Sequence, residues 1–372
     1  MSMKLDQLTI RGFKSIKKLD GFDLQNLNIL IGANGTGKSN FIDFFRMIHA
    51  MMELNLGGFT EKHGGADGFF FNGPSTTKKI HAEMMFGKNG YRFSLEPTVD
   101  ERFMFSSEER YYRGGNTGWW TIGSGYVEAK LPGEKDQSGI NGAAHGVPFY
   151  VYNAINSWQV YHFHDTSATS AMRRSEIVDD CMKLRPNGSN IAPYLLNLRE
   201  ESVDIYESIV DHVKLVAPFF DDFLLTPRKN GKKTLKVKLD WKQKNSDFPM
   251  QPYHFSDGTI RFICLVTVLL QSTPPSVIIL DEPELGLHPF AISVLAGIIQ
   301  AASSNSQLIV STQSTLLLNH FSPSDVVVVD RKGGKGSTFR RLDNTALERW
   351  LEDYTLGELL EKNVLDGGPS HA

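Results

Sequence analysis

The sequence predicts an α/β protein with a mainly parallel, doubly wound core sheet. The apolar run Leu27–Ile31 predicts a buried strand, and it leads through a glycine-rich loop into residues 40–52, whose apolar positions recur at helical spacing. From Pro252 onward the patterns alternate between helix and strand, which is typical of a parallel sheet. A second apolar run, residues 276–280, ends directly before two adjacent carboxylates. These three observations define the expected core.

Shorter patterns predict the remaining elements. Residues 4–11 predict a first strand, and residues 57–165 predict short strands with glycine-rich turns, which together suggest an antiparallel β subdomain. Within this stretch we expect residues 114–146 to be mobile. Residues 187–217 predict two helices, and the leucines of residues 354–365 predict a helix that docks on the core.

Length and composition are those of a globular protein with one large or two ordinary domains. The chain has 372 residues, and 41% of them are hydrophobic, enough for a sizeable core. It has two cysteines, Cys181 and Cys264, and no charged-then-apolar leader, so we expect a cytoplasmic protein without disulfides or a membrane anchor. The net charge of −3 gives no overall field that would attract nucleic acid.

Residues 32–39, Gly-Ala-Asn-Gly-Thr-Gly-Lys-Ser, match the phosphate-binding template of P-loop NTPases. Glycines allow backbone N–H groups to surround an anion, and the loop lies between a predicted strand and the N-terminus of a predicted helix. We expect Lys38 to bind the β- and γ-phosphates and the Ser39 hydroxyl to ligate Mg²⁺. The predicted nucleotide-binding residues of the loop are Gly32, Asn34, Gly35, Gly37, Lys38, Ser39 and Asn40.

Asp281 and Glu282 directly follow the apolar strand at residues 276–280. Asp281 is placed to hold Mg²⁺, directly or through water, opposite Ser39. Glu282 is placed to polarise an attacking water. Two acids after a strand can also cap the next helix, but here a proline-containing loop separates them from the next helical run.

Two segments of the C-terminal half resemble motifs of ABC-type ATPases of the RecF, SMC and OLD group. Residues 281–289, Asp-Glu-Pro-Glu-Leu-Gly-Leu-His-Pro, resemble the second nucleotide motif and the D-loop of that group. Residues 255–261, Phe-Ser-Asp-Gly-Thr-Ile-Arg, resemble its signature motif, with one predicted helix between the two. The resemblance covers most of the chain except residues 100–150. It implies an ABC-ATPase head whose helical subdomain carries the signature motif.

The resemblance implies roles for further residues. Ser256 and Gly258 are expected to approach the γ-phosphate of ATP held by a second copy of the chain, so that two ATP molecules are sandwiched in a head-to-tail homodimer. The implied cofactors are ATP and Mg²⁺. The implied catalytic residues are Lys38, Glu282 and Gln313, and the implied metal ligands are Ser39 and Asp281.

Three positions depart from the pattern of the group. Asp257 stands where the signature usually has glycine, and Thr259 stands where it has glutamine or glutamate. Gln313 stands where the group carries a switch histidine. Because glutamine can orient water but cannot take up a proton, slow hydrolysis is expected. No glutamine in residues 60–100 fits the Q-loop of the group.

We expect three structural units. Residues 1–165 would form an N-terminal ATPase lobe with the P-loop and a β-rich insertion. Residues 166–250 would form a helical subdomain and a basic β-hairpin. Residues 251–372 would form a C-terminal ATPase lobe with the signature, the second nucleotide motif, the D-loop and the switch.

The segment of residues 228–244 is basic. Alternating residues around Asn230-Gly231 predict a hairpin. Such a hairpin could track the phosphate backbone of DNA, but the simpler expectation is a solvated hairpin whose lysines protect a sheet edge. The segment has one acid, Asp240, and the basic residues Arg228, Lys229, Lys232, Lys233, Lys236, Lys238, Lys242 and Lys244.

Two further pairs of residues are candidate binding sites. His162 and His164 alternate near Asp165, which suits two ligands of a metal site, but no third ligand is identifiable in the sequence. A loop contact in the adjacent turn is the simpler expectation. Arg173 and Arg174 are expected to be a solvated pair, with a phosphate contact as the alternative.

The resemblance implies a cytoplasmic RecF- or OLD-like ATPase that acts with DNA, in repair or in defence against phage, together with a separate nuclease or toprim-type effector. A transporter cassette is an alternative, but the long separation of Lys38 from Asp281 and the atypical signature disfavour it. A small-molecule kinase is another alternative, although it would need neither the signature-like segment nor the D-loop. An SMC-type structural protein is disfavoured because the sequence has no coiled-coil heptads.

Overall fold

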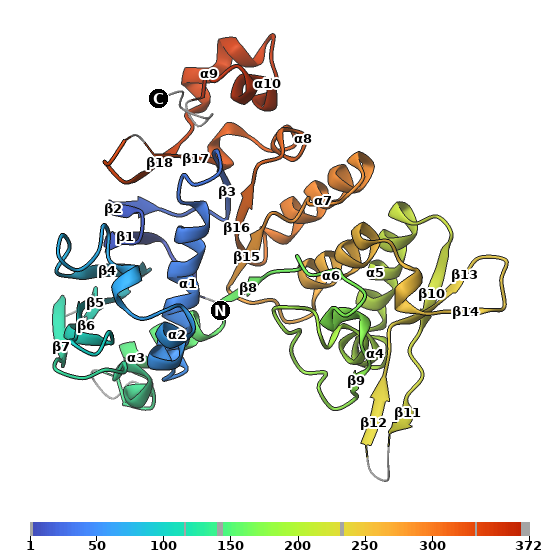
Figure 1. Cartoon of the computed structure of the whole chain (residues 1–372), viewed down its shortest axis with the longest axis horizontal. Helices are drawn as coiled ribbons and strands as arrows, with labels where there is room; N and C mark the ends of the chain where they lie inside the picture. The colour runs from blue at the N-terminus through green and yellow to red at the C-terminus, as the bar shows by residue number, and fades with distance from the viewer. Residues whose placement is uncertain (1–2, 115–116, 140–143, 231–233, 332, 366–372) are drawn as a thin grey trace.

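The computed structural model describes residues 3–114, 117–139, 144–230, 234–331 and 333–365 (Figure 1). The helices of this part are α1 (Lys38–Met52), α2 (Leu56–Lys62), α3 (Val147–Asn156), α4 (Ile191–Glu201), α5 (Val203–Val216), α6 (Asp257–Leu270), α7 (Pro289–Ala302), α8 (Thr315–Leu318), α9 (Asn344–Leu351) and α10 (Leu356–Glu361). No helix within these ranges is both long and apolar enough to cross a membrane.

The strands of the same ranges form four sheets. In the N-terminal half they are β1 (Gln7–Phe13), β2 (Ile16–Asp23), β3 (Leu27–Ile31), β4 (Ile80–Phe86), β5 (Asn89–Pro97), β6 (Phe103–Tyr112), β7 (Gly118–Gly123), β8 (Gln159–Tyr161) and β9 (Glu176–Ile177). In the C-terminal half they are β10 (Phe220–Leu224), β11 (Arg228–Asn230), β12 (Thr234–Val237), β13 (Asp240–Gln243), β14 (Pro249–Met250), β15 (Val277–Asp281), β16 (Gln307–Thr312), β17 (Val326–Arg331) and β18 (Ser337–Arg341).

The first six-stranded sheet is antiparallel, with the strand order β2-β1-β4-β5-β6-β7, as the sequence predicts. Burial alternates along β4, where Ile80, Ala82, Met84 and Phe86 all point to the core, because successive side chains of a strand face opposite sides. The expectation of mobility for residues 114–146 is wrong for β7, which pairs with β6 along its length.

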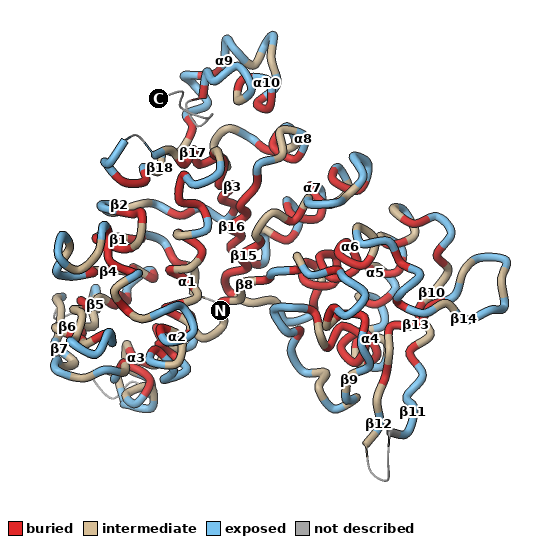
Figure 2. The backbone as a smooth tube through the Cα atoms, viewed as in Figure 1, coloured by how far each residue is buried: buried red, intermediate tan, exposed pale blue. Residues whose placement is uncertain are grey.

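The second six-stranded sheet is the mainly parallel core, with the order β18-β17-β3-β16-β15-β8. All its neighbouring strands are parallel except β17 and β18. Every residue of β3 and β16 is buried, and Figure 2 shows this centre as a continuous buried region. Strands covered on both faces are continuously apolar, which explains the unbroken apolar runs in the sequence.

Helix α1 lies between the two large sheets (Figure 1). Its side chains Phe41 and Phe45 share one core cluster with Ile279 of β15 and with the antiparallel sheet. The opposite face of the core sheet, including Ile278 and Leu280, belongs to a second cluster with α6 and α7. The core sheet therefore separates the environment of α1 from that of α6.

The hairpin predicted around Asn230-Gly231 is present as β11 and β12, but it does not extend over the whole basic segment. Arg228–Asn230 and Thr234–Val237 pair with each other, and β12 also pairs with β9. The next strand, Asp240–Gln243, instead pairs with β10 and β14 in a separate sheet. Asp240 is buried, and its carboxylate binds the guanidinium of Arg228 in β11 at 3.0 Å. Residues 231–233 lie outside the described residues.

The two helices predicted in residues 187–217 are present as α4 and α5. The helix predicted for residues 354–365 is shorter than expected. Only Leu356–Glu361 is helical there. Thr355 caps it, because its hydroxyl accepts from the amide of Glu358 at 3.3 Å and the Glu358 carboxylate accepts from the amide of Thr355 at 2.8 Å. The leucines do dock on the core as predicted, since Leu356 and Leu359 are buried.

Candidate nucleotide-binding site

Three parallel strands bring the sequence motifs to one edge of the core sheet. The loop of residues 32–39 follows β3, Asp281 ends β15, and Gln313 follows β16. The register pairs Asp281 with Ser311 on one side of β16 and Thr312 with Ile31 on the other. Carboxyl ends of parallel strands are where α/β sheets bind ligands.

The backbone of the loop requires its glycines. A Cβ atom on Gly32 would lie 2.1 Å from the carbonyl oxygen of Val329, and one on Gly37 would lie 2.1 Å from Oγ of Ser337. Gly35 has φ +79°, a left-handed conformation that side chains disfavour. A Cβ on Gly35 would meet nothing within 4 Å, so this part of the loop faces open space.

Two serines far apart in the sequence support the loop from behind. Oγ of Ser337 lies 2.7 Å from Oγ of Ser15 and 2.5 Å from the carbonyl oxygen of Thr36. The side-chain amide of Asn40, a predicted nucleotide-binding residue, donates to Oγ of Ser15 at 2.7 Å. The sequence patterns did not identify this support, because Ser337 belongs to a separate hairpin, β17–β18, that carries no motif.

Lys38 is buried at the start of α1, with 5% of its surface exposed. Its ammonium group donates to the carbonyl oxygens of Gly32 and, at 3.1 Å, Ala33. Burial lowers the pKa of Lys38, and the carboxylates of Glu282, Asp281 and Glu284 partly offset this effect. The lysine thus lies in the electrostatic field of the acids that follow β15.

Glu282 lies in a left-handed backbone conformation with φ +46°. Such a conformation in a non-glycine residue costs about 1–3 kcal/mol and is common at functional sites. The amide of Glu282 donates to the carbonyl oxygen of Ser311 at 2.8 Å. Its carboxylate accepts a hydrogen bond from the side-chain amide of Gln313, so the structure joins the predicted water-polarising residue to the predicted switch residue.

Glu284 is a third acid of this region, and no motif in the sequence assigns it a role. Its Oε1 accepts from the hydroxyl of Thr312 at 2.6 Å and from the amide of Gln313 at 3.2 Å. Its Oε2 is buried and has no hydrogen-bond partner among the described residues. Burial raises the pKa of Glu284. The sequence offered one indication of a buried acid: Glu284 lies between two apolar residues, Pro283 and Leu285.

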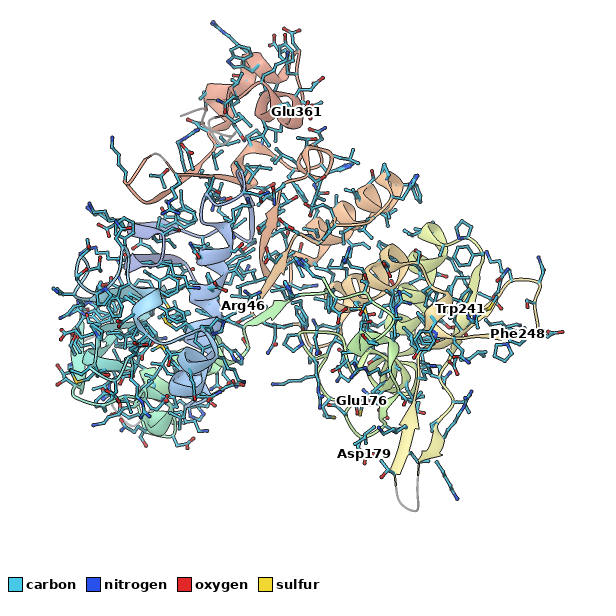
Figure 3. All side chains as sticks on the ribbon, in the orientation of Figure 1. Arg46, Glu176, Asp179, Trp241, Phe248 and Glu361 are labelled. Carbon is cyan, nitrogen blue, oxygen red and sulfur yellow. The ribbon has the colours of Figure 1, made fainter. Side chains whose placement is uncertain are left out.

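The histidine pair lies beside Asp281, because β8 runs parallel to β15. Nε2 of His164 lies 3.0 Å from the backbone oxygen of Asp281, and the ring centroids of His162 and His164 are 3.9 Å apart. Burial, the neighbouring ring of His164 and the charge of Arg46 lower the pKa of His162; Arg46 reaches β8 from α1 (Figure 3).

No group of three or more metal-ligating side chains occurs in the described part of the chain. The metal alternative for the histidine pair therefore gains no third ligand there. In the adjacent turn, Oδ1 of Asp165 accepts from the backbone amide of Ser167 at 3.1 Å and from its hydroxyl at 2.7 Å, but neither bond involves a histidine, so the loop contact expected for the pair stays a prediction.

Ser256 caps the N-terminus of α6 and is exposed. Its Oγ accepts from the amide of Thr259 at 3.1 Å. A Cβ on Gly258 would lie only 2.4 Å from the carbonyl oxygen of Gly286, so the signature helix and the D-loop pack closely together. Gly258 is therefore required for packing within one chain, whatever it also contacts.

The expectation that Arg173 is solvated is wrong, because its side chain is buried. Its guanidinium binds the carboxylate of Asp257 at 2.8 Å and the backbone oxygens of Phe255, at 3.1 Å, and Pro252. Such a multidentate contact suits the rigid fork of arginine. The side chain holds the signature segment in place, and Asp257, the departure from the usual glycine, supplies one of its partners. Arg174 remains exposed.

The D-loop presents apolar side chains to solvent. Leu285 is 48% exposed, and Phe290, at the start of α7, is 53% exposed. His288 caps α7 through an acceptor contact with the amide of Phe290 at 3.3 Å. Large exposed apolar side chains beside a predicted site are typical of an interaction surface.

Two family models match the chain, and both are ATPase-type domains. Residues 3–111 match the AAA ATPase domain. Residues 152–319 match an AAA domain whose description names, as a candidate member, the AbiEii toxin of a type IV toxin–antitoxin system. No curated protein matches the sequence.

Solved structures of SMC heads share the fold of this chain. One is the SMC head bound to the C-winged helix domain of ScpA, with a TM-score of 0.55 and 16% identity. Another, derived from Pyrococcus furiosus, is the SMC head with an extended coiled coil bound to the C-terminal domain of ScpA, with a TM-score of 0.53 and 15% identity. In both cases the similarity covers 94% of this chain and 99% of the other.

Proposed function

We propose that this chain is an ABC-type AAA ATPase of the SMC and RecF group, and that it binds ATP with Mg²⁺ and hydrolyses it slowly between two copies of itself. The two matched AAA domains and the fold shared with SMC heads support this proposal. The observation that carries the proposal is the convergence of Lys38, Asp281, Glu282 and Gln313 on one sheet edge. A generic nucleotide binder would not need the strained Glu282 or its contact with Gln313.

The residues of the loop fit a triphosphate and Mg²⁺. The ammonium group of Lys38 already binds two oxygen atoms, the carbonyls of Gly32 and Ala33, and phosphate oxygens can take the same positions with a better charge match. Ser39 and Asp281 offer a hydroxyl and a carboxylate, the hard oxygen ligands that Mg²⁺ prefers.

Hydrolysis would depend on the pair of Glu282 and Gln313. Glu282 would polarise the attacking water, and Gln313 would orient the Glu282 carboxylate through the hydrogen bond between their side chains. A glutamine cannot exchange a proton with the reaction, unlike the histidine it replaces. This supports slow turnover.

The placement of Ser256 supports a two-chain site. Lys38 begins α1, which packs against one face of the core sheet, whereas Ser256 begins α6, which packs against the other. Ser256 is exposed, and two residues further on Gly258 packs against Gly286 of the D-loop, the segment that carries the exposed Leu285. A second copy, related by a two-fold axis, would cover this surface and present its own ATP to Ser256.

Sedimentation of the Glu282→Gln variant tests this proposal. The variant should be monomeric without nucleotide, dimeric with Mg²⁺ and ATP, and at least about 100-fold slower in hydrolysis, because a general base contributes roughly that factor or more. Adding Lys38→Ala to the variant should abolish the ATP-dependent dimer. A Glu282→Gln protein that stays monomeric at saturating ATP would contradict the two-chain site.

We further propose that the ATPase acts in DNA repair or in defence against phage, with a separate nuclease or toprim-type effector. The family model that names a toxin–antitoxin system supports the defence role. The hairpin β11–β12, which projects from the helical part in Figure 1, is the proposed DNA contact. Its Lys229 and Lys236 form no ion pair with another described residue, while Arg228 is already paired with Asp240.

A salt titration of DNA binding tests the hairpin. Replacing Lys229 and Lys236 by alanine should weaken binding and flatten the dependence of affinity on salt, because each lost phosphate contact removes about one unit of slope. Lys17→Ala and Lys18→Ala, at two exposed positions of β2, provide a control of equal charge change. An unchanged slope in the hairpin variant would remove the hairpin from the proposed DNA site.

A further inference from the structure

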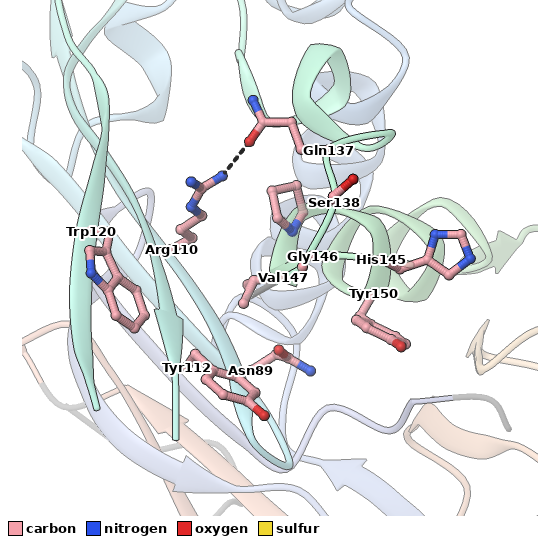
Figure 4. Close-up of a pocket in the computed structure, with 12 residues that line it drawn as sticks. Asn89, Arg110, Tyr112, Trp120, Gln137, Ser138, His145, Gly146, Val147 and Tyr150 are labelled. Carbon is pink, nitrogen blue, oxygen red and sulfur yellow. Dashed lines mark hydrogen bonds between the residues drawn. The ribbon is translucent and has the colours of Figure 1, made fainter. Parts of the chain in front are cut away.

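A cavity of about 320 Å³ lies in the N-terminal lobe (Figure 4). One wall is formed by β5, β6 and β7, and the other by residues 137–139, residues 145–146 and the start of α3. Its lining within the described chain includes no residue of the P-loop, the signature segment or the D-loop. Much of the lining belongs to residues 112–151, which lie between the two matched family domains. The volume is at the lower end of that of small-molecule sites.

Strand register places four chemically distinct side chains on one face of the sheet. Tyr112 pairs with Asn89 of β5, and Arg110 pairs with Trp120 of β7. Paired residues share a face, and so do residues two apart on one strand, such as Arg110 and Tyr112. Helix α3 contacts β5 and β6 and contributes Tyr150, which also lines the cavity (Figure 4).

A buried carboxylate fastens the neighbouring segment to the sheet. Glu108 of β6 is fully buried and accepts from the hydroxyls of Tyr91, at 2.7 Å, and Tyr126, at 2.6 Å. It also accepts from the amides of Lys130, at 3.0 Å, and Leu131, at 3.1 Å. Because both oxygens of this carboxylate have partners, the segment that carries the loop toward α3 is anchored independently of any ligand.

The cavity combines aromatic rings with groups that favour an anion. The guanidinium of Arg110 donates to Glu134 at 2.6 Å and to Gln137 at 3.0 Å, and both bonds use the same nitrogen. Arginine carries further N–H donors on its other two nitrogens. Gly146, the residue before α3, lines the cavity and has no side chain that could cap the helix. The N-terminal end of α3 therefore lies at the cavity, and the helix dipole there favours an anion.

We propose that this cavity binds a mononucleotide unit. The base would stack on Trp120, Tyr112 or Tyr150, and the phosphate would lie near Arg110 and the N-terminus of α3. Aromatic stacking accepts any base, while the cation and the helix dipole select for the phosphate. The unit is either a free nucleotide or part of a single-stranded nucleic acid. The site is separate from the proposed ATPase site, which holds its nucleotide by the triphosphate.

The test uses the full chain with Lys38→Ala, so that binding at the P-loop does not contribute. Thymidine monophosphate and a short oligothymidylate serve as probes in ligand-observed NMR titrations. Trp120→Ala should weaken the binding of whichever probe binds by about tenfold or more, because stacking on one aromatic side chain contributes that much. Trp119→Ala is the matched control: Trp119 is the adjacent residue of β7, points to the opposite face, and packs against Tyr111 with ring centroids 5.1 Å apart and the rings tilted by 45°.

Tyr150→Ala provides a second variant, because its side chain is 42% exposed and its loss should leave the fold intact. It should also weaken binding. Similar affinities for both probes would identify a free nucleotide as the ligand; tighter, salt-dependent binding of the oligothymidylate would identify single-stranded nucleic acid. The proposal is overturned if neither probe binds at millimolar concentration, or if Trp119→Ala weakens binding as much as Trp120→Ala does. Neither result would bear on ATP hydrolysis, which is measured with Lys38 intact.

Discussion

The side-chain amide of Gln313 donates a hydrogen bond to the carboxylate of Glu282, linking the ends of β16 and β15. The amide of Glu282 in turn donates to the carbonyl oxygen of Ser311 at 2.8 Å. These two contacts hold Glu282 in its left-handed conformation. The acid that we propose as the water-polarising group is thus oriented by the strand that carries the switch residue.

Replacing Gln313 by alanine should therefore slow hydrolysis while leaving ATP binding nearly unchanged. The Glu282 carboxylate would lose its orienting partner, and a misplaced catalytic group costs on the order of 10- to 100-fold in rate. Steady-state kinetics should show the loss in kcat rather than in KM. Gln25→Ala, at an exposed position, should leave both constants unchanged. Equal kcat values for Gln313→Ala and the unmodified protein would contradict the proposed role.

Replacing Lys38 by alanine should weaken ATP binding by about 10- to 100-fold, because a charged hydrogen-bond donor to the phosphates is lost. Titration calorimetry with ATP and Mg²⁺ measures this directly. Lys17→Ala removes an equal charge from an exposed position of β2 and should not change the affinity. An unchanged affinity in the Lys38→Ala protein would exclude the P-loop as the nucleotide site.

The stability conferred by Glu284 should fall as pH rises. Burial raises the pKa of this carboxyl above its usual value of about 4.5, so the folded chain keeps a proton that the unfolded chain has already released. At pH values between about 4.5 and the raised pKa, unfolding therefore releases a proton. In this pH range the free energy of unfolding decreases as the pH rises. One pKa unit corresponds to about 1.4 kcal/mol.

Thermal unfolding of Glu284→Gln tests this relationship. The amide keeps an acceptor for Thr312 but does not titrate, so the Tm of the variant relative to the unmodified protein should increase between pH 5 and pH 8. Glu361→Gln, at the exposed end of α10, should show no such trend. A Tm difference that is independent of pH would show that the proton balance at Glu284 does not change on unfolding.

Replacing Gly258 by alanine should destabilise the fold by about 1–3 kcal/mol, because the added methyl would lie 2.4 Å from the carbonyl oxygen of Gly286. Gly297→Ala is the matched control, since Gly297 lies within α7 and an added Cβ would meet nothing within 4 Å. That change should stabilise the protein by about 0.5–1 kcal/mol. Chemical denaturation of the two variants should shift the midpoints in opposite directions.

The core of the fold and its principal motifs were predictable from the sequence because they are encoded locally. The apolar run Leu27–Ile31 matches β3, and the alternating patterns after Pro252 correspond to α6, β15, α7 and β16. The roles of the site residues and the division at residues 165 and 250 remain predictions. The antiparallel β subdomain was also foreseen, although β7 was mistaken for part of a mobile tract, since its glycine-rich surroundings resemble those of a loop.

The errors have a common physical origin. Arg173 was expected to be solvated because charged side chains usually are, yet its carbonyl and carboxylate partners lie in a segment far along the chain. The basic residues from Arg228 to Lys244 were grouped by sequence, whereas β13 pairs with β10 and β14 instead. Periodicity indicates which face of an element is buried, but not which element covers it.

The amino-acid sequence by itself determined the P-loop, the paired acids after β15 and the positions of the apolar core strands β3 and β15, because each depends on residues close together in the chain. The order of the strands in the core sheet was decided by the tertiary structure. Only the tertiary structure decided that Ser337 supports the loop, that Glu284 is buried beside Gln313, and that Arg110 and Trp120 face a common cavity. These relationships depend on strand pairing and packing between distant segments. Contacts between distant segments stabilise the fold but produce no periodic pattern in the sequence.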